Sequence, residues 1–177
     1  MKKEMILVTG AARSGKSRHA EARATQLGAR RLYLATAEAN DEEMVARIAA
    51  HRKRRGGDWM TIEEPVELTT TLLAQRGRID CALVDCVTIW LSNLLLSRNL
   101  AHAETRVDEL VRTLPSLDFH VLLVTNEVGW SIVPDNALAR QFRDLAGWAN
   151  QRLAAVASEV VLTVAGLPMT IKRVSCA

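Results

Sequence analysis

The chain has 177 residues, of which 49% are hydrophobic and 24% are charged, so it can bury one sizeable core. A formal net charge of +3 fits an anionic small substrate at least as well as a nucleic acid. No apolar run approaches the roughly 18 residues that a membrane span needs, and no targeting segment is evident. We therefore expect a soluble, untargeted protein with a single domain over residues 1–177.

The cysteines bear on the cellular compartment. Cys81, Cys86 and Cys176 are odd in number and lack the spacing of a metal site. We interpret them as buried thiols in a reducing environment, which predicts a cytoplasmic protein.

The N-terminal part of the chain predicts a strand, a helix and a second strand. Residues 5–8 form a continuous apolar run, as in a strand that is buried on both faces. Residues 16–27 predict a helix that Gly28 ends, and residues 31–36 predict the next strand. A strand, a helix and a strand at this spacing predict a βαβ unit and hence a parallel sheet.

The rest of the chain continues the alternation of strands and helices. Residues 40–56 predict a helix, residues 59–63 predict an edge strand, and Pro65 is expected to open a helix that Gly77 closes. The further predicted elements are a strand over 79–86, helices over 87–99 and 104–114, a strand over 119–127, a long amphipathic helix over 136–156, and short strands over 160–165 and 170–174 that can pair as a hairpin.

The clearest functional motif follows the first strand, where residues 10–17 match the phosphate-loop pattern G-x-x-x-x-G-K-[ST]. Glycines let backbone N–H groups turn toward an anion, and the helix that follows offers its positive end. Lys16 is expected to reach the β- and γ-phosphates, and the Ser17 hydroxyl is expected to ligate Mg²⁺. The predicted phosphate-binding residues are Gly10, Ala11, Ala12, Arg13, Ser14, Gly15, Lys16 and Ser17.

Polar residues end two of the predicted core strands, and in a parallel sheet ligands gather at that edge. Asp85 is the natural partner of Ser17 for Mg²⁺, either directly or through water, and the alternative is that Asp85 caps the following helix. Thr125, Asn126 and Glu127 lie at the same edge, where they can contact phosphate, water or an acceptor, or can simply brace the loop.

His51 stands out because four basic residues, Arg52, Lys53, Arg54 and Arg55, follow it directly. Their positive charge favours a neutral imidazole and attracts polyphosphate, although the C-terminal end of the helix dipole acts in the opposite direction. The alternative interpretation is a solvated helix end whose charges suit that dipole. The residues alone leave both interpretations open.

With these motifs in hand, the sequence resembles the bifunctional adenosylcobinamide kinases / adenosylcobinamide-phosphate guanylyltransferases of cobalamin biosynthesis, over nearly the whole chain. The most specific stretches are the Ala-Arg-Ile-x-x-His sequence of residues 46–51 and the Thr-Asn-Glu-Val-Gly sequence of residues 125–129. The other similar stretches are residues 6–21, 33–36, 83–88, 132–134, 141–147 and 150–153.

The resemblance implies an α/β P-loop NTPase (RecA-like) three-layer fold with a central mostly parallel sheet, assembled as a homotrimer. It implies phosphorylation of adenosylcobinamide by ATP or GTP, followed by transfer of GMP from GTP through guanylylated His51, with pyrophosphate and adenosylcobinamide-GDP as products. Lys16 and His51 are then the catalytic residues, with Mg²⁺ as cofactor and without nucleic-acid or membrane partners. The implied nucleotide contacts are the phosphate loop, Ala35, Thr36, Ala37, Arg52, Lys53, Arg54, Arg55, Glu63 and Asp85.

Two rival functions remain open from the residues alone. One is a plain small-molecule kinase that uses only the phosphate loop and Asp85. The other is a nucleotide-binding switch or RecA-like module without a small substrate, in which residues 52–55 contact nucleic acid.

Overall fold

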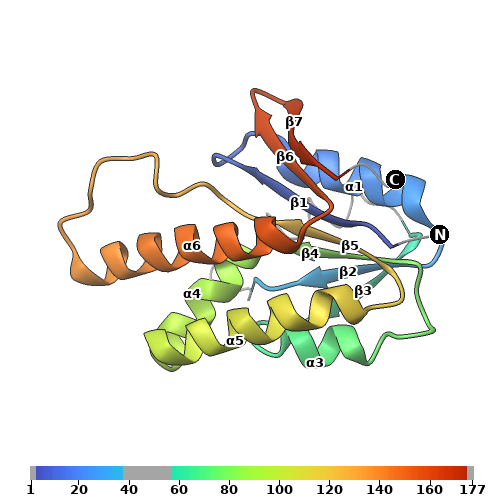
Figure 1. Cartoon of the computed structure of the whole chain (residues 1–177), viewed down its shortest axis with the longest axis horizontal. Helices are drawn as coiled ribbons and strands as arrows, with labels where there is room; N and C mark the ends of the chain where they lie inside the picture. Colours follow the sequence, from blue (N-terminus) through green and yellow to red (C-terminus); the bar gives the residue numbers. More distant parts are fainter. Residues whose placement is uncertain (1–2, 38–56, 175–177) are drawn as a thin grey trace.

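The computed structural model describes residues 3–37 and 57–174, and its centre is a seven-stranded sheet (Figure 1). All neighbouring strands are parallel except the last pair, which is antiparallel, so the mostly parallel sheet is confirmed. The order across the sheet is β3 (Trp59–Glu63), β2 (Arg31–Ala35), β4 (Cys81–Asp85), β5 (His120–Val124), β1 (Met5–Gly10), β6 (Glu159–Val164) and β7 (Leu167–Arg173).

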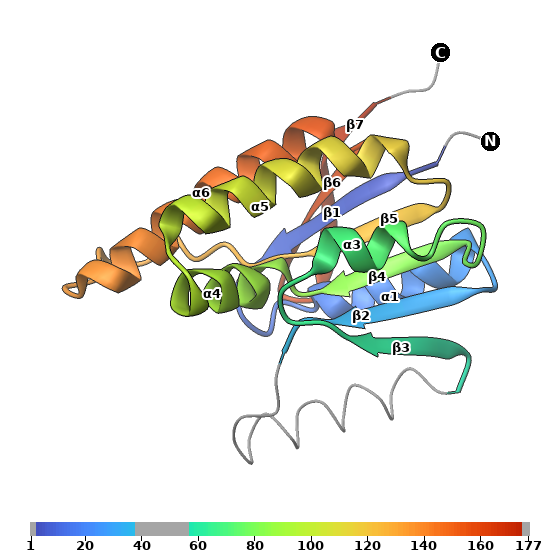
Figure 2. The ribbon, with the colours of Figure 1, turned by 90° about the horizontal axis from the view of Figure 1, so that it is seen from below.

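Helices cover both faces of the sheet and make three layers (Figure 2). The helix α1 (Lys16–Leu27) packs on one face, where Ile6 and Val8 of β1 meet Ala20 and Ala24. Leu7 points to the opposite face, because successive residues of a strand alternate in direction. That face carries α3 (Leu68–Leu73), α4 (Val87–Ser97), α5 (Leu100–Thr113), the short 3₁₀ helix η1 (Leu114–Ser116) and α6 (Ala137–Val156).

Most predicted elements are confirmed, but two helices begin at different residues. Pro65 does not open α3, because the Glu64 carboxylate accepts the backbone N–H groups of Val66 and Glu67 at 3.0 and 2.8 Å and holds a turn there. The next difference is α5, which begins four residues before the predicted start, since the Asn99 side chain accepts the His102 N–H at 2.9 Å and caps the helix. The predicted helix over 40–56 lies outside the described residues.

The C-terminal strands form the predicted hairpin, and the turn between them consists of Ala165 and Gly166. Their φ angles are 52° and 83°, as in the two-residue turns that suit the twist of a hairpin. The hairpin also extends the sheet, because β6 pairs in parallel with β1.

Two further findings concern the cysteines and the membrane. Cys81 and Cys86 are buried free thiols, as expected, and burial raises the pKa of Cys81 to about 12 and that of Cys86 to about 11. Cys176 lies outside the described residues. Within residues 3–37 and 57–174, no helix has the length and apolar character that crossing a bilayer requires.

Candidate functional site

Strand register brings the predicted site residues of four strands to one edge of the sheet. Ala35 of β2 is level with Glu63 of β3 on one side and with Asp85 of β4 on the other. Asp85 is level with Val124 of β5, which is in turn level with Val8 of β1. The phosphate loop begins two residues beyond Val8, so all these positions meet at the C-terminal edge of the parallel strands.

The phosphate loop has a backbone that requires glycine at two points. Gly10 has φ of +153°, and a Cβ atom there would lie 2.5 Å from the carbonyl oxygen of Thr163. Gly15 has φ of +96°, in the left-handed region, and immediately precedes α1. The motif glycines therefore satisfy a steric requirement of this fold as well as offering N–H groups to an anion.

The β6–β7 hairpin holds the phosphate loop in place. The hydroxyl oxygens of Ser14 and Thr163 are 2.8 Å apart and share a buried hydrogen bond. The backbone N–H of Gly166, in the hairpin turn, donates to the carbonyl oxygen of Ser14 at 2.9 Å. Ser14 is thus tied to both β6 and the turn, which fixes the loop from outside the motif.

The N-terminus of α1 is arranged for an anion. Its N-cap is Gly15, no side chain caps the helix, and its first turn holds no acidic residue, so N–H groups of that turn are available to phosphate oxygens. Lys16 is only 8% exposed, and its ammonium donates to the carbonyl oxygen of Ala11 at 2.9 Å across the loop. Ser17, the next residue, is half-buried.

Asp85 is half-buried at the end of β4, and its carboxylate accepts the Tyr33 hydroxyl at 2.8 Å. The N-cap position of α4 belongs to Cys86, with no side-chain cap, so the capping alternative does not describe how this helix begins. One strand, β5, separates Asp85 from β1, a span of about 10 Å at the usual strand spacing. A group that bridges Asp85 and the phosphate loop must therefore pass over the end of β5.

The residues that follow β2 and the residue that ends β3 differ in burial and in hydrogen bonding. The buried Thr36 hydroxyl donates to the carbonyl oxygen of Cys86 at 2.8 Å and also accepts the Cys86 N–H, so it joins the ends of β2 and β4. Ala35 and Ala37 on either side of it are half-buried, and Glu63 is exposed at the edge of the sheet. Nucleotide contacts at these positions stay predictions.

Beyond the end of β5, the chain carries a polar network that sequence reasoning identified only in part. The Thr125 hydroxyl donates to Asn150 Oδ1 at 2.8 Å, and the Thr88 hydroxyl accepts the Asn126 N–H at 2.7 Å. Glu127 accepts the Thr9 hydroxyl at 2.6 Å. Thr9 and Asn150 were not predicted as site residues, since each belongs to an ordinary strand or helix in the sequence.

His51, Arg52, Lys53, Arg54 and Arg55 lie outside the described residues. Their predicted roles in nucleotide binding and in covalent transfer are therefore not placed relative to the phosphate loop.

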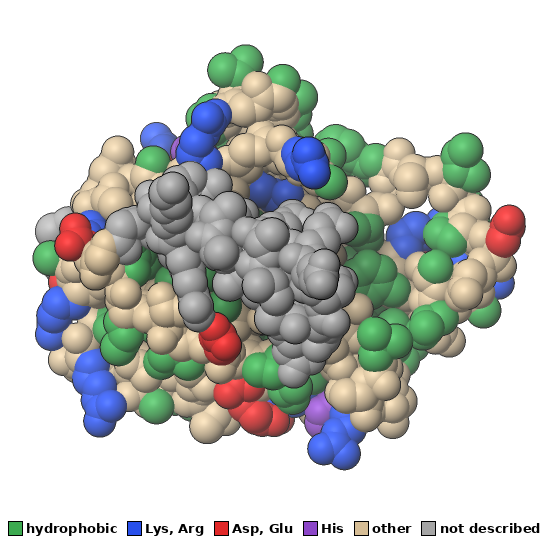
Figure 3. Space-filling model, turned by 180° about the vertical axis from the view of Figure 1, so that it is seen from behind, with side chains coloured by type: hydrophobic (Ala, Val, Ile, Leu, Met, Phe, Trp, Pro, Cys, Tyr) green, Lys and Arg blue, Asp and Glu red, His purple; other side chains and the backbone are tan. Residues whose placement is uncertain are grey.

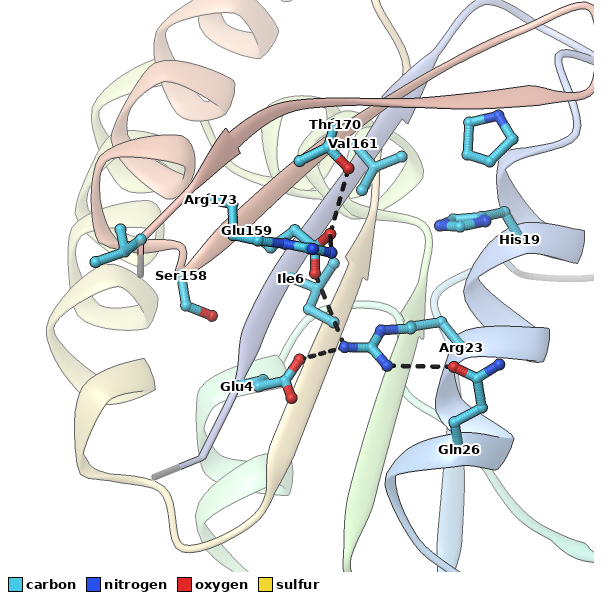
Figure 4. Close-up of a pocket in the computed structure, with 12 residues that line it drawn as sticks. Glu4, Ile6, His19, Arg23, Gln26, Ser158, Glu159, Val161, Thr170 and Arg173 are labelled. Atoms are coloured by element: carbon cyan, nitrogen blue, oxygen red, sulfur yellow. Dashed lines mark hydrogen bonds and ion pairs between the residues drawn. The ribbon is translucent and has the colours of Figure 1, made fainter. Parts of the chain in front are cut away.

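A cavity of about 830 Å³ lies between α1 and the β6–β7 hairpin (Figure 4). Its charged side chains pair with one another: Arg23 lies 2.7 Å from Glu4, and Arg173 lies 2.6 Å from Glu159. Glu4 precedes β1 and Glu159 begins β6, so the cavity adjoins the N-terminal ends of these strands. The residues that line it include none of those predicted for the nucleotide site.

On the face opposite to that of Figure 1, the Lys and Arg side chains that can be seen lie over several elements (Figure 3).

The sheet, the phosphate loop and the carboxylates at the strand ends define a P-loop nucleotide-binding protein of the α/β class. The RadB recombinase has a similar structure, with a TM-score of 0.55 and 13% identity, over 90% of this chain and 73% of that one. The P4 protein from bacteriophage phi6, solved in complex with ADP, is also similar, with a TM-score of 0.53 and 15% identity. The match covers 98% of this chain and 55% of that one. These similarities concern the fold alone, and they confirm the expected RecA-like architecture.

Sequence comparisons then identify the family. A model described as cobinamide kinase / cobinamide phosphate guanyltransferase matches residues 6–171. The bifunctional adenosylcobalamin biosynthesis protein CobP of Pseudomonas aeruginosa is 45% identical over 166 residues, covering 94% of this chain and 96% of that protein. CobU of Salmonella typhimurium is also 45% identical, over 184 residues that cover 95% of this chain and 99% of that protein. The chain belongs to this family and is a bifunctional cobinamide kinase and cobinamide phosphate guanylyltransferase of cobalamin biosynthesis.

Proposed function

We propose that a single nucleotide site at the C-terminal edge of the sheet serves both reactions. The observation that carries this proposal is the α1 N-terminus, which has no side-chain cap, with Lys16 buried in the loop beside it. The phosphate-loop residues 10–17 bind the triphosphate of ATP or GTP. Lys16 is the catalytic cation, because an ammonium at this position stabilises the charge that develops on the transferred group.

We propose Mg²⁺ as the cofactor, held by the Ser17 hydroxyl and by Asp85 either directly or through water. A hydroxyl and a carboxylate are hard oxygen donors, and Mg²⁺ commonly takes one or two protein ligands and completes its shell with phosphate oxygens and water. Ser17 and Asp85 fit that pattern, since both are half-buried and can be reached by phosphate oxygens and water. The bound ion would neutralise charge on the β- and γ-phosphate oxygens.

For the second reaction we propose that His51 is the nucleophile. A neutral imidazole nitrogen attacks the α-phosphorus of GTP, a nitrogen–phosphorus bond forms, and pyrophosphate leaves with the electrons of the broken bond. An oxygen of cobinamide phosphate then attacks the same phosphorus and releases His51. Arg52, Lys53, Arg54 and Arg55 would stabilise the leaving pyrophosphate, with further nucleotide contacts from Ala35, Thr36, Ala37, Glu63 and Asp85.

The remaining expectations concern assembly and location. We propose a homotrimer acting in the cytoplasm, with residues 1–177 as one catalytic domain and adenosylcobinamide and its phosphate as the other substrates. Exposed apolar side chains support an assembly, since large apolar patches often mark contact surfaces. They include Trp130, Ile132 and Val133 in the loop after β5, and Leu167, Met169 and Ile171 on β7.

The experiment that tests this function supplies the purified protein with adenosylcobinamide and nucleotides in two stages. With ATP alone we expect the reaction to stop at the phosphorylated corrinoid. Addition of GTP should then release pyrophosphate and form the GDP adduct. A product that stays at the phosphate after GTP is added would instead identify a plain small-molecule kinase.

A further inference from the structure

Glu127 occupies the position between the two halves of the proposed nucleotide site. Its strand, β5, lies between β1, which leads into the phosphate loop, and β4, which ends in Asp85. The half-buried Glu127 follows β5 by three residues at the same edge of the sheet. A nucleotide whose phosphates bridge the loop and Asp85 therefore passes this carboxylate.

The backbone around Glu127 is locked to the phosphate loop. The Glu127 N–H donates to the carbonyl oxygen of Gly10 at 3.2 Å, and the Thr125 N–H donates to that of Val8 at 3.0 Å. On the other side, Asn150 of α6 donates to the carbonyl oxygen of Asn126 at 3.2 Å. The carboxylate is therefore held at a fixed place relative to the first residue of the loop.

The side-chain contacts of Glu127 use one of its two oxygens. Oε1 accepts both the Thr9 hydroxyl at 2.6 Å and the Asn150 amide at 3.3 Å. Among the described residues, no side chain or backbone group donates to Oε2. Both partners of Oε1 are neutral, so these contacts orient the carboxylate without neutralising its charge.

The two reactions of this enzyme differ in their need for a carboxylate that accepts a proton. Phosphorylation of adenosylcobinamide uses a hydroxyl as nucleophile, which must lose a proton, and a positioned carboxylate is a common acceptor for it. Guanylyl transfer uses a phosphate oxygen as nucleophile, which carries no proton that must be removed. A carboxylate that faces the acceptor is thus needed for the first reaction only.

We infer that Glu127 is a catalytic residue of the kinase step, in which Oε2 accepts a hydrogen bond from the acceptor hydroxyl and takes its proton. The hydroxyl oxygen bonds to the γ-phosphorus, the bond from that phosphorus to the bridging oxygen breaks, and the nucleoside diphosphate leaves with the electron pair. The proton then passes from Glu127 to solvent. This inference rests on the proposed location of the nucleotide at the phosphate loop.

The test is Glu127→Gln, assayed separately for phosphorylation of adenosylcobinamide and for guanylyl transfer to its phosphate. The amide oxygen of Gln can still accept the Thr9 hydroxyl. The substitution therefore removes the charge and the proton-accepting capacity of residue 127 and keeps this hydrogen bond. We expect kcat of the kinase step to fall about 100-fold with little change in KM for the nucleotide, and guanylyl transfer to fall far less. Glu127→Asp, which keeps a carboxylate, should recover part of the kinase rate.

Glu64→Gln is the matched control, because the Glu64 carboxylate accepts the Val66 and Glu67 N–H groups in the turn before α3. A kinase kcat within about twofold of wild type in Glu127→Gln would overturn the inference. An equal loss of both activities with a raised KM for the nucleotide would also overturn it, because that result is expected of a residue with a purely structural role. Absence of both activities in the wild-type protein would instead refute the proposed function.

Discussion

Carboxylates at the two ends of the parallel sheet are contacted by different kinds of donor groups. At the N-terminal end two carboxylates pair with a guanidinium: Asp80, just before β4, lies 2.7 Å from Arg30, and Glu159 lies 2.6 Å from Arg173. At the C-terminal end, the Glu127 carboxylate instead accepts hydrogen bonds from two neutral groups, the Thr9 hydroxyl at 2.6 Å and the Asn150 amide at 3.3 Å. A carboxylate oriented by neutral groups can still bind a cation or accept a proton, whereas one paired with arginine mainly holds the structure together.

The largest effect that this contrast predicts follows Lys16→Ala at the C-terminal end. Removal of a cation that stabilises the transferring phosphoryl group should lower both the kinase and the guanylyltransferase rates by about 100-fold or more. Lys172→Ala is the matched control, because the Lys172 ammonium donates to the carbonyl oxygens of Ala154 and Ala155 at the end of α6. It should lower Tm slightly and keep both rates. Near-normal turnover of Lys16→Ala in either reaction would show that Lys16 of the phosphate loop is not needed for that reaction.

An intermediate effect is expected from Asp85→Asn, at the C-terminal end of β4. Loss of a charged ligand should raise the Mg²⁺ concentration for half-maximal kinase rate by about tenfold or more. The Asn side chain can still accept the Tyr33 hydroxyl, so that hydrogen bond is kept. A metal titration that matches wild type, together with a lower Tm, would assign Asp85 a structural role.

The smallest effect is expected from the same substitution at the other end of β4, Asp80→Asn. The hydrogen bonds from the Arg30 side chain, and those from the backbone N–H groups of Arg30 and Ala29, hold the pKa of Asp80 at about 2. A carboxyl whose pKa is lowered on folding stabilises the protein above its unfolded pKa. That contribution is lost as the pH falls from about 4 toward 2.

The Tm of Asp80→Asn should therefore lie below that of wild type at pH 7, and this gap should narrow as the pH falls toward 2. Both enzyme activities at pH 7 should stay at the wild-type level. A loss of activity without a loss of stability would contradict the assignment of a structural role to the carboxylates at the N-terminal end of the sheet.

The sequence predicted much of this molecule because its strongest signals are local. The apolar runs of β1 and β5 are buried on both faces, and the long helix α6 spans Ala137–Val156, within one residue of the range predicted for it. The phosphate loop was also predictable, since its glycines, Lys16 and Ser17 are neighbours in sequence. Asp85 could be placed at the same edge because a parallel sheet aligns its strand ends.

The rest depended on which strands become neighbours, and local patterns do not determine that. Thr9 and Glu127 form a hydrogen bond although they are 118 positions apart in the chain. Their meeting requires β5 to lie beside β1, just as the bond between Ser14 and Thr163 requires β6 on the other side of β1. The side-chain network that orients Glu127 could therefore be recognised only once the strand order was known.

The central claim, that this chain carries out guanylyl transfer through His51, is tested most directly with GTP labelled at the α-phosphate. After incubation and denaturing electrophoresis, we predict that the wild-type protein and His102→Ala retain a label that is lost in acid, stable in base, and moved to cobinamide phosphate in a chase. His51→Ala should retain none, because the nitrogen–phosphorus bond cannot form without the imidazole. A label that remains on His51→Ala and survives acid would contradict the account and place the nucleophile on another residue.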